Sequence, residues 1–338
     1  MPNAVVSEAI DTVASGEDLS ADRAQQVLHD IMSDTVEPAQ TAAFLIALRT
    51  KGETVEELVG LARTMRDLAL AVEVTGEELL DTAGTGGGVP TFNVSTTAAL
   101  VAAAAGARVA KHGNRSATSL SGSADLLEAL GARIDLEPAA VAECIEEIGF
   151  GFMFAPRHHA ATRHVVPVRK ALGVRTIFNF LGPLTNPAGA KRQVIGVSDP
   201  SKLETLALAL AELGAESALV VSSADGLDEF SVSGTTRVVE LRDGSLTTYD
   251  VSPDELGLQA AGDGAVAAGT PDQNARVLRD VLAGEPGTER SLAVLNAAAA
   301  IYVGGRADSL ATGVQLAEAS IDEGAATRVL EGYLEHAR

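Results

Sequence analysis

Two polar, glycine-rich turns between residues 81 and 131 contain the groups best suited to binding a phosphate. The first turn reads DTAGTGGGVPTFNVST and follows an apolar run that ends at Leu80. Its glycines leave several backbone N–H groups free to converge on one anion. A helix expected at residues 97–105 adds the favourable dipole of its N-terminus. We therefore expect phosphate or pyrophosphate here, although many glycine-rich turns are only tight connections.

The second turn, KHGNRSATSLSGSAD, adds positive charge and more donors after a strand-like run at residues 107–110. Nine of its residues can donate a hydrogen bond to phosphate oxygens: Lys111, His112, Asn114, Arg115, Ser116, Thr118, Ser119, Ser121 and Ser123. Because two such turns occur in one chain, phosphate binding explains them better than a pair of ordinary connections.

Two adjacent carboxylates, Asp228 and Glu229, are expected at the end of another strand, after the apolar run at residues 218–221. Mg²⁺ typically takes one or two protein carboxylates, keeps several waters and binds substrate phosphate oxygens. The pair therefore predicts a magnesium site. The alternative is an ordinary solvated acidic turn.

A segment rich in histidine and arginine, APRHHAATRHVVPVRKALG, could recognise an acidic substrate. Arg169 is its best candidate for a carboxylate, because a guanidinium can bind one bidentately. The histidines match no common zinc spacing, and the nearby arginines would repel a cation. The alternative is a basic helix face in solvent.

The apolar pattern predicts a mainly parallel sheet flanked by helices, which would bring these turns together. Strand candidates alternate with helical stretches and lie at residues 108–110, 151–154, 193–197 and 218–221. Two further runs, 237–241 and 245–249, are joined by Arg-Asp-Gly and predict an antiparallel hairpin.

The first 72 residues are expected to form a small all-helical domain, and residues 76–338 a larger α/β domain. Ser20 can cap one helix, Pro38 opens a second, and Thr54 with Glu57 forms a capping box for a third. The fold class is therefore α/β with a helical N-terminal domain.

Composition and charge exclude several classes of protein. The 338 residues are 46% apolar, yet no segment is apolar enough throughout to predict a membrane span. An acidic N-terminal region predicts no signal peptide and a cytoplasmic protein. The single cysteine, Cys144, has the helical spacing of a buried apolar residue.

The net charge of −21 argues against binding nucleic acid through its phosphates. Residues 108–192 nevertheless hold eleven Lys and Arg against seven Asp and Glu. A small polyanion is the expected partner of this segment, unless it only balances neighbouring acidic helices.

The motifs resemble those of the anthranilate phosphoribosyltransferase family in order and approximate spacing. They read GTGG with FNVST, KHGNR with SGSAD and LEALG, PVRKALGVRTIFNFLGPLTNPA, and DGLDE. The resemblance implies the phosphoribosyltransferase-like fold, usually in a homodimer that contacts through its helical parts. It also implies transfer of phosphoribosyl from phosphoribosyl pyrophosphate (PRPP) to anthranilate, giving N-(5-phosphoribosyl)anthranilate and pyrophosphate in tryptophan biosynthesis.

The resemblance further implies roles for individual residues. Lys111, Asn114 and Arg169 would be catalytic, with Asn114 and Arg169 binding anthranilate. Mg²⁺ would be the cofactor, bound by Ser95, Asp228 and Glu229. The residues expected to bind the substrates are Gly84, Gly87, Thr91, Asn93, Val94, Ser95, Thr96, Lys111, His112, Gly113, Asn114, Arg115, Ser116, Ala117, Thr118, Ser119, Ser123, His159, Arg169 and Gly182.

The first turn departs from the family's pattern. The family commonly reads GTGGDG, whereas this chain reads GTGGGV and reaches Phe92 one residue sooner. An acidic residue near the pyrophosphate and the metal is therefore missing. We expect the activity to be retained with an altered metal dependence.

Two other functions fit part of the sequence. A pyrimidine nucleoside phosphorylase shares a similar architecture, but KHGN and GPLTNPA favour anthranilate as the substrate. A non-catalytic paralogue that binds nucleic acid is disfavoured by the charge of −21 and by the Asp228 and Glu229 pair.

Overall fold

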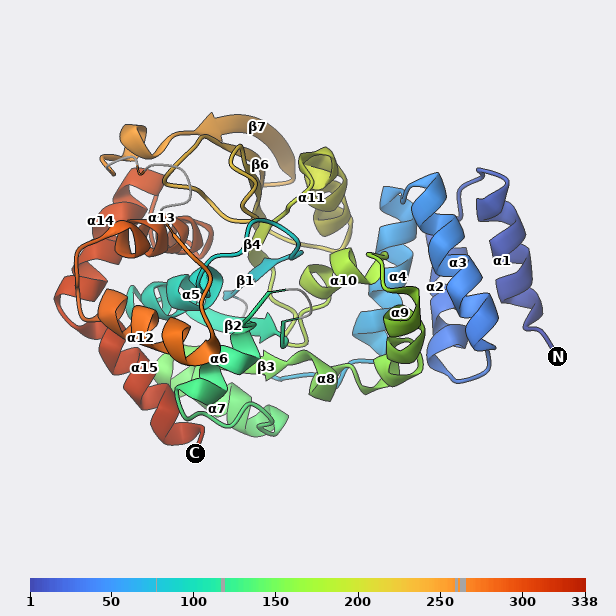
Figure 1. Cartoon of the computed structure of the whole chain (residues 1–338), viewed down its shortest axis with the longest axis horizontal. Helices are drawn as coiled ribbons and strands as arrows, with labels where there is room; N and C mark the ends of the chain where they lie inside the picture. Colours follow the sequence, from blue (N-terminus) through green and yellow to red (C-terminus); the bar gives the residue numbers. More distant parts are fainter. Residues whose placement is uncertain (77, 117–118, 259–260, 262–265) are drawn as a thin grey trace.

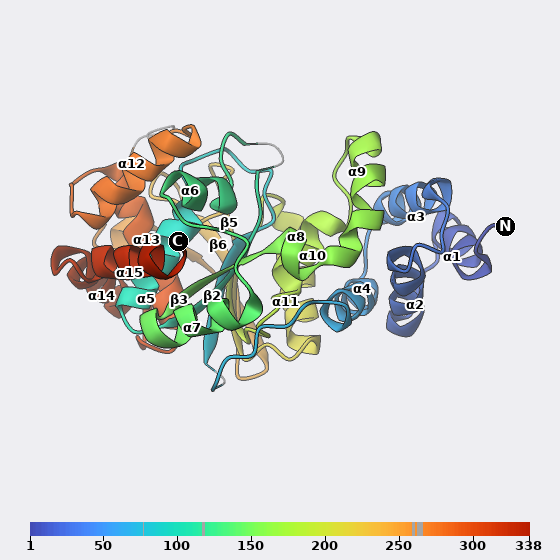
Figure 2. The ribbon, with the colours of Figure 1, turned by 90° about the horizontal axis from the view of Figure 1, so that it is seen from below.

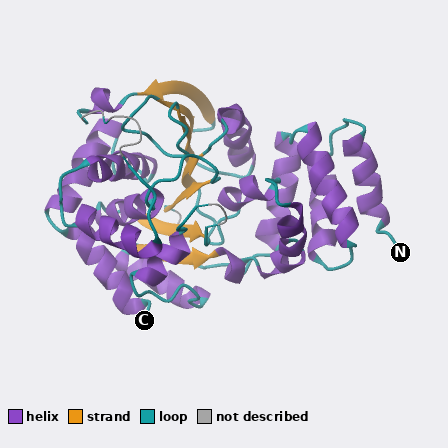
Figure 3. Cartoon of the chain, in the orientation of Figure 1, coloured by secondary structure: helices purple, strands orange, loops and turns teal. Residues whose placement is uncertain are grey.

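The structure, a computed structural model, describes residues 1–76, 78–116, 119–258, 261 and 266–338. A layer of N-terminal helices lies beside a larger part in which helices surround a sheet (Figures 1 and 3). This arrangement confirms the predicted fold class. The expected boundary between residues 72 and 76 falls in a segment without helix or strand.

The N-terminal layer contains α1 (Ala4–Ala14), α2 (Ala21–Met32), α3 (Pro38–Lys51) and α4 (Val55–Asp67). The predicted caps are confirmed, because the Ser20 side chain accepts from the Arg23 N–H and Pro38 opens α3. Thr54 and Glu57 form the reciprocal capping box at the start of α4.

Seven strands of the described chain form one sheet in the order β3-β2-β1-β4-β5-β6-β7. Their bounds are β1 Leu79–Gly84, β2 Arg108–Gly113, β3 Phe150–Phe154, β4 Arg192–Gly196, β5 Ser217–Ser223, β6 Thr236–Arg242 and β7 Ser245–Val251. Strands β3, β2, β1, β4 and β5 are parallel, and β6 and β7 add antiparallel at the edge. The predicted hairpin is confirmed, with Asp243 and Gly244 at positive φ in its turn.

Two predicted boundaries were wrong. Helix α5 (Val94–Ala104) begins at Val94 and not at Thr97, because Asn93 already occupies the N-cap position. Strand β2 continues past Ala110 to Gly113, because Lys111 and His112 pair with Phe152 and Met153 of β3. Lys111 and His112 therefore belong to the sheet and not to the turn after it.

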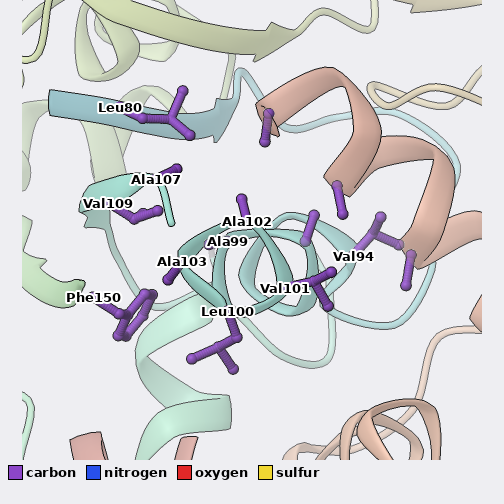
Figure 4. Close-up of a cluster of buried hydrophobic side chains, with 14 of the residues drawn as sticks. Leu80, Val94, Ala99, Leu100, Val101, Ala102, Ala103, Ala107, Val109 and Phe150 are labelled. Carbon is purple, nitrogen blue, oxygen red and sulfur yellow. The ribbon is translucent and has the colours of Figure 1, made fainter. Parts of the chain in front are cut away.

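Helices cover both faces of the sheet. Leu219 and Val221 of β5 join a core cluster with α5 and the C-terminal helices, whereas Ala218 and Val220 face the other way. Figure 4 shows the first cluster, with alanines of α5 lying beside Leu80 of the sheet. The second cluster runs from the opposite face into the N-terminal layer without a break.

The remaining helices connect the strands and complete the two layers. Between β2 and β5 these are α6 Ser123–Ala129, α7 Pro138–Ile148, α8 Ala155–His158, η1 Ala160–His164, α9 Val166–Leu172, α10 Phe178–Leu184, η2 Pro200–Lys202 and α11 Leu203–Glu212. After β7 they are η3 Pro253–Leu256, α12 Pro271–Leu282, α13 Thr288–Val303, α14 Leu310–Asp322 and α15 Ala325–His336. Among the described residues, no helix combines the length and apolar character needed to cross a membrane.

Candidate active site

The sequence-predicted turns meet at the carboxyl ends of the parallel strands. Helix α5, after β1, covers one face of the sheet, and α11, after β4, covers the other. Adjacent strands whose connections diverge in this way mark the usual ligand-binding crevice of an open α/β sheet. The α9 and α10 segment lies between the sheet and the N-terminal helices (Figure 2).

The turn after β1, residues 85–91, is held from two sides; we call it the glycine loop. On one side, Arg175 Nη1 donates to the Gly86 carbonyl at 2.6 Å, and the Ser198 hydroxyl donates to the same oxygen at 3.0 Å. On the other side, the Gly86 N–H donates to Asp228 Oδ2 at 2.9 Å. Gly86 and Gly87 have φ of 66° and 87°, a conformation that favours glycine.

Asp228 packs so closely against this loop that side chains are excluded around it. A Cβ on Gly84 would lie 2.8 Å from Asp228 Oδ2, and one on Gly88 would lie 2.7 Å from Oδ1. Gly88 stands where the family commonly has the acidic residue. In this chain the backbone of the loop lies directly against Asp228.

Lys111 lies beneath the glycine loop, and its ammonium group makes three hydrogen bonds within the protein. It is 1% exposed and donates to the Thr82 carbonyl at 2.6 Å and to the hydroxyls of Thr82 and Ser95 at 3.3 Å each. Burial lowers its pKa, while Asp81 and Glu229 act in the opposite direction. The expected phosphate-binding lysine thus holds Ser95 at the start of α5.

Asp81 is a fully buried carboxylate of the site that the sequence analysis did not identify. It accepts from the His112 N–H at 3.0 Å and from the Asn186 amide at 2.7 Å. Burial raises its pKa, and the nearby Lys111 opposes that rise. Asn186 also donates to the Ala110 carbonyl at 2.8 Å, so it links the segment after α10 to β1 and β2.

The Asp228 and Glu229 pair has the chemistry of a cation site. Burial, and then the charge of Asp228, raises the pKa of Glu229 to about 8. Burial also raises the pKa of Asp228. Glu229 accepts the Ser95 N–H, which brings the three expected metal ligands together. Among the described residues, no group of three or more histidine, cysteine, aspartate or glutamate side chains is placed to hold a metal ion.

The turn after β2 is organised by acidic partners. Arg115 forms ion pairs with Asp125 and Glu128, and the Ser116 N–H donates to Asp125 Oδ2 at 3.0 Å. Asn114 accepts the Arg115 N–H through its side chain at 2.7 Å. In this structure the Arg115 charge is therefore satisfied within the protein.

Other residues of this turn that are expected to bind substrate contact near neighbours in the structure. Gly113 ends β2 beside Phe152, and the Ser116 and Ser119 hydroxyls lie 2.6 Å apart. Ala117 and Thr118 lie outside the described residues.

The first turn of α5 is tied to the turn after β2. The Asn93 amide donates to the Ser121 carbonyl at 3.1 Å, and the buried Asn274 of α12 donates to Asn93 Oδ1 at 2.8 Å. Thr96 donates to the Ser123 hydroxyl at 3.1 Å. Asn93 makes no side-chain cap bond, and the first N–H groups of α5 bond elsewhere: that of Val94 to the Phe92 carbonyl at 2.7 Å and that of Ser95 to Glu229. Thr91 bonds its neighbour's carbonyl, and Val94 is buried in the core.

Arg169 on α9 is a half-buried cation without a polar partner. Its guanidinium lies over the Phe178 ring, 5.2 Å from the centroid. Within the part of the chain that the structure describes, it makes no side-chain hydrogen bond or ion pair. Burial lowers its pKa, and a bound anion would offset the cost of that burial.

The histidines expected near Arg169 have separate environments. His112 Nδ1 donates to the Gly182 carbonyl at 3.2 Å, and His159 Nε2 donates to the Thr185 carbonyl at 3.1 Å. Their rings lie 5.0 Å apart. Burial, followed by the neighbouring histidine, lowers the pKa of both, to about 4 for His159. Both rings are therefore neutral at pH 7.

His158 and His164 make their contacts outside the crevice. His158 bonds the Leu70 carbonyl at 2.7 Å, in the segment that leaves the N-terminal layer. His164 pairs with Asp34 at 3.0 Å. The histidine and arginine segment is thus divided between the crevice and the contact with the helical layer.

Asp81, Arg175, Asn186 and Asn274 were not predicted from the sequence as site residues. Asp81 stands at the end of an apolar run, which was the available signal. The other three bond residues far away along the chain, such as Asn274 with Asn93 and Arg175 with Gly86. Nothing in the local pattern indicated those partners.

Known proteins with similar sequences and folds agree with this geometry. A model of the glycosyl transferase family α/β domain matches residues 76–327, and one of the helical bundle domain matches residues 7–69. The anthranilate phosphoribosyltransferase of Symbiobacterium thermophilum is 52% identical over 94% of this chain and 94% of its own length. That of Rubrobacter xylanophilus is also 52% identical, over 99% of this chain and 98% of its own length.

Solved structures give the same result. Anthranilate phosphoribosyltransferase from Thermus thermophilus superposes with a TM-score of 0.92 at 45% identity, covering 98% of this chain and 99% of that chain. The Saccharomyces cerevisiae enzyme in complex with PRPP and Mg gives 0.90 at 29% identity, covering 99% of this chain and 98% of that one. The resemblance read from the motifs is confirmed, and the chain belongs to the anthranilate phosphoribosyltransferase family.

Proposed function

We propose that this protein transfers the phosphoribosyl group of PRPP to anthranilate, releasing pyrophosphate, as a pentosyltransferase of tryptophan biosynthesis. The observation that carries the proposal is the crevice at the ends of β1, β2 and β5. A loop with free N–H groups and an acidic pair meet there, and the α9 segment adds an unpaired arginine. The first two features suit a metal-bound pyrophosphate, and the third suits the carboxylate of anthranilate.

The pyrophosphate is proposed to bind at the glycine loop and the start of α5. The N–H groups of Gly87 and Gly88 have no hydrogen-bond partner among the described residues. These donors can bind an anion without reorganisation, and the dipole at the start of α5 adds to the attraction. Lys111 contributes its positive charge and holds the Ser95 hydroxyl in place.

Magnesium is proposed to be held by Asp228, Glu229 and the Ser95 hydroxyl. The raised pKa values of the two carboxylates support this, because each reflects a negative charge that the protein alone leaves poorly compensated. When bound, Mg²⁺ supplies neutralisation of the negative charge that develops on the leaving pyrophosphate.

Anthranilate is proposed to bind with its carboxylate on Arg169, with Asn114 as a second contact. The Arg169 guanidinium can form two parallel hydrogen bonds to a carboxylate. The aromatic amine of anthranilate is largely unprotonated at neutral pH, so alignment with the anomeric carbon replaces a strong general base. The neutral His112 and His159 leave Arg169 as the cation that attracts the carboxylate.

The test is to mix the purified protein with PRPP, Mg²⁺ and anthranilate and to follow the loss of anthranilate fluorescence. Magnesium-dependent loss is expected, and titration of Mg²⁺ would show whether the GTGGGV loop shifts the metal optimum. No loss at any Mg²⁺ concentration would reject the transferase. Release of base from a pyrimidine nucleoside by phosphate would then favour the phosphorylase.

A homodimer in the cytoplasm is also proposed. Large apolar side chains are exposed near the ends of α4 and α9: Leu68, Leu70, Val166 and Val174. A homodimer that contacts through the helical parts would cover these side chains. Light scattering after size exclusion should give twice the chain mass of 34.6 kDa, and a monomer at micromolar concentration would reject the dimer.

A further inference from the structure

The orientation of the glycine loop depends on a residue outside the loop. Arg175, in the connection between α9 and α10, donates from Nη1 to the Gly86 carbonyl at 2.6 Å and from Nη2 to the Thr85 carbonyl at 3.4 Å. The Ser198 hydroxyl shares the Gly86 oxygen. Two consecutive carbonyls are thus turned toward the same guanidinium.

This contact fixes the direction of the next two N–H groups. The described chain has no cis peptide, and in a trans peptide the carbonyl of one residue and the N–H of the next point in opposite directions. With the Thr85 carbonyl on Arg175, the Gly86 N–H faces away, and it indeed reaches Asp228. By the same geometry, the Gly86 carbonyl on Arg175 turns the free Gly87 N–H away from the guanidinium and toward the Asp228 side.

Further contacts hold the Arg175 guanidinium in place. It stacks over the Phe180 ring at 5.9 Å, and Lys202 approaches the same ring at 5.8 Å. A Cβ on Gly87 would overlap Arg175 Nη1, so the loop and the guanidinium are in close contact. Arg175 is half-buried.

We infer that Arg175 is a positioning residue for the proposed transfer: it holds the carbonyls of Thr85 and Gly86 and thereby aims the Gly87 N–H at the departing pyrophosphate. This inference rests on the proposed function and adds a residue that acts through the loop. Arg169, on the same segment, acts on the other substrate. The two arginines should therefore give different kinetic signatures.

The test compares wild type with Arg175→Ala, Arg175→Lys and Ser198→Ala. For Arg175→Ala we expect the KM for PRPP and the inhibition constant of pyrophosphate to rise roughly tenfold, as for the loss of one or two orienting hydrogen bonds. The KM for anthranilate should stay within about threefold. Lysine keeps one donor for the Gly86 carbonyl and should rescue in part, and Ser198→Ala should give a smaller shift in the same direction.

Hydrogen exchange measured by mass spectrometry supplies a readout that does not need activity. Residues 84–92 should exchange faster in Arg175→Ala, and magnesium pyrophosphate should protect them in wild type but not in the variant. Lys170→Ala removes an exposed cation from the same segment and should change neither measurement. Unchanged exchange in the loop, or a KM for PRPP within about twofold of wild type, would overturn the inference. An inactive wild type with intact exchange behaviour would reject the proposed function instead.

Discussion

The two sides of the crevice are built differently. On the phosphate side, Lys111 is buried and its ammonium bonds the Thr82 carbonyl and two hydroxyls before any ligand arrives. On the acceptor side, Arg169 is half-buried and has no polar partner in the described chain. The phosphate side is therefore organised in advance, whereas the acceptor side keeps an unsatisfied charge for its ligand.

This difference agrees with what each side must do. Negative charge develops on the leaving pyrophosphate during the transfer, and donors fixed beforehand stabilise such charge without reorganisation. The anthranilate carboxylate does not change its charge, so Arg169 needs only to bind and align it. Removing groups from the phosphate side should accordingly affect the rate, and removing Arg169 should mainly affect one substrate's binding.

The largest effect is expected for Lys111→Met. This change removes the charge that offsets Asp81 and Glu229 and frees the Ser95 hydroxyl. We expect kcat/KM to fall by at least about 100-fold and the free energy of unfolding to fall by roughly 3 kcal/mol. Steady-state kinetics and urea unfolding would measure the two effects, with Lys170→Ala as the control. Activity within about threefold of wild type would show that Lys111 does not organise the phosphate side for catalysis.

The next effect concerns the metal. Glu229→Gln keeps the size of the side chain but cannot ionise to bind a cation, so we expect the affinity for Mg²⁺ in the presence of PRPP to weaken by about tenfold or more. Binding of Mn²⁺, followed by electron paramagnetic resonance, would measure this without turnover. Asp254→Asn, on η3 and away from the crevice, is the control. Equal affinities for wild type and Glu229→Gln would contradict the proposed metal site.

A smaller effect is expected from His159 on the acceptor side. Burial lowers its pKa to about 4, so between pH 6.5 and 4 the unfolded chain binds more protons than the folded one. The free energy of unfolding should fall as the pH drops through this window, by up to about 3 kcal/mol, and should keep its full value above it.

His159→Gln should reduce that pH dependence, because glutamine can donate to the Thr185 carbonyl and does not titrate. The remainder comes from His112 and His158, whose pKa values burial also lowers. Urea unfolding at pH 7.5 and pH 5 would measure the difference, with the exposed His29→Gln as control. Identical pH dependence in wild type and His159→Gln would show that this histidine does not contribute.

The sequence predicted those parts of the molecule that depend on local pattern. The capping box at Thr54, the Asp-Gly hairpin turn and the strand positions follow from short-range rules, and the structure confirms them. Lys111 and His112 were wrongly placed in a turn, because only pairing with β3 extends β2 that far. The Asn93 and Asn274 bond and the Arg175 clamp on the glycine loop depend on side-chain contacts between distant residues, which no local periodicity specifies.

The most direct test of the two-sided account is the KM of Arg169→Ala for each substrate. The account predicts that the KM for anthranilate rises at least about tenfold while the KM for PRPP stays within about threefold. Thermal unfolding near that of wild type would exclude a general loss of structure. Equal increases for the two substrates would contradict the assignment of Arg169 to anthranilate, and with it the division of the crevice into an organised and an open side.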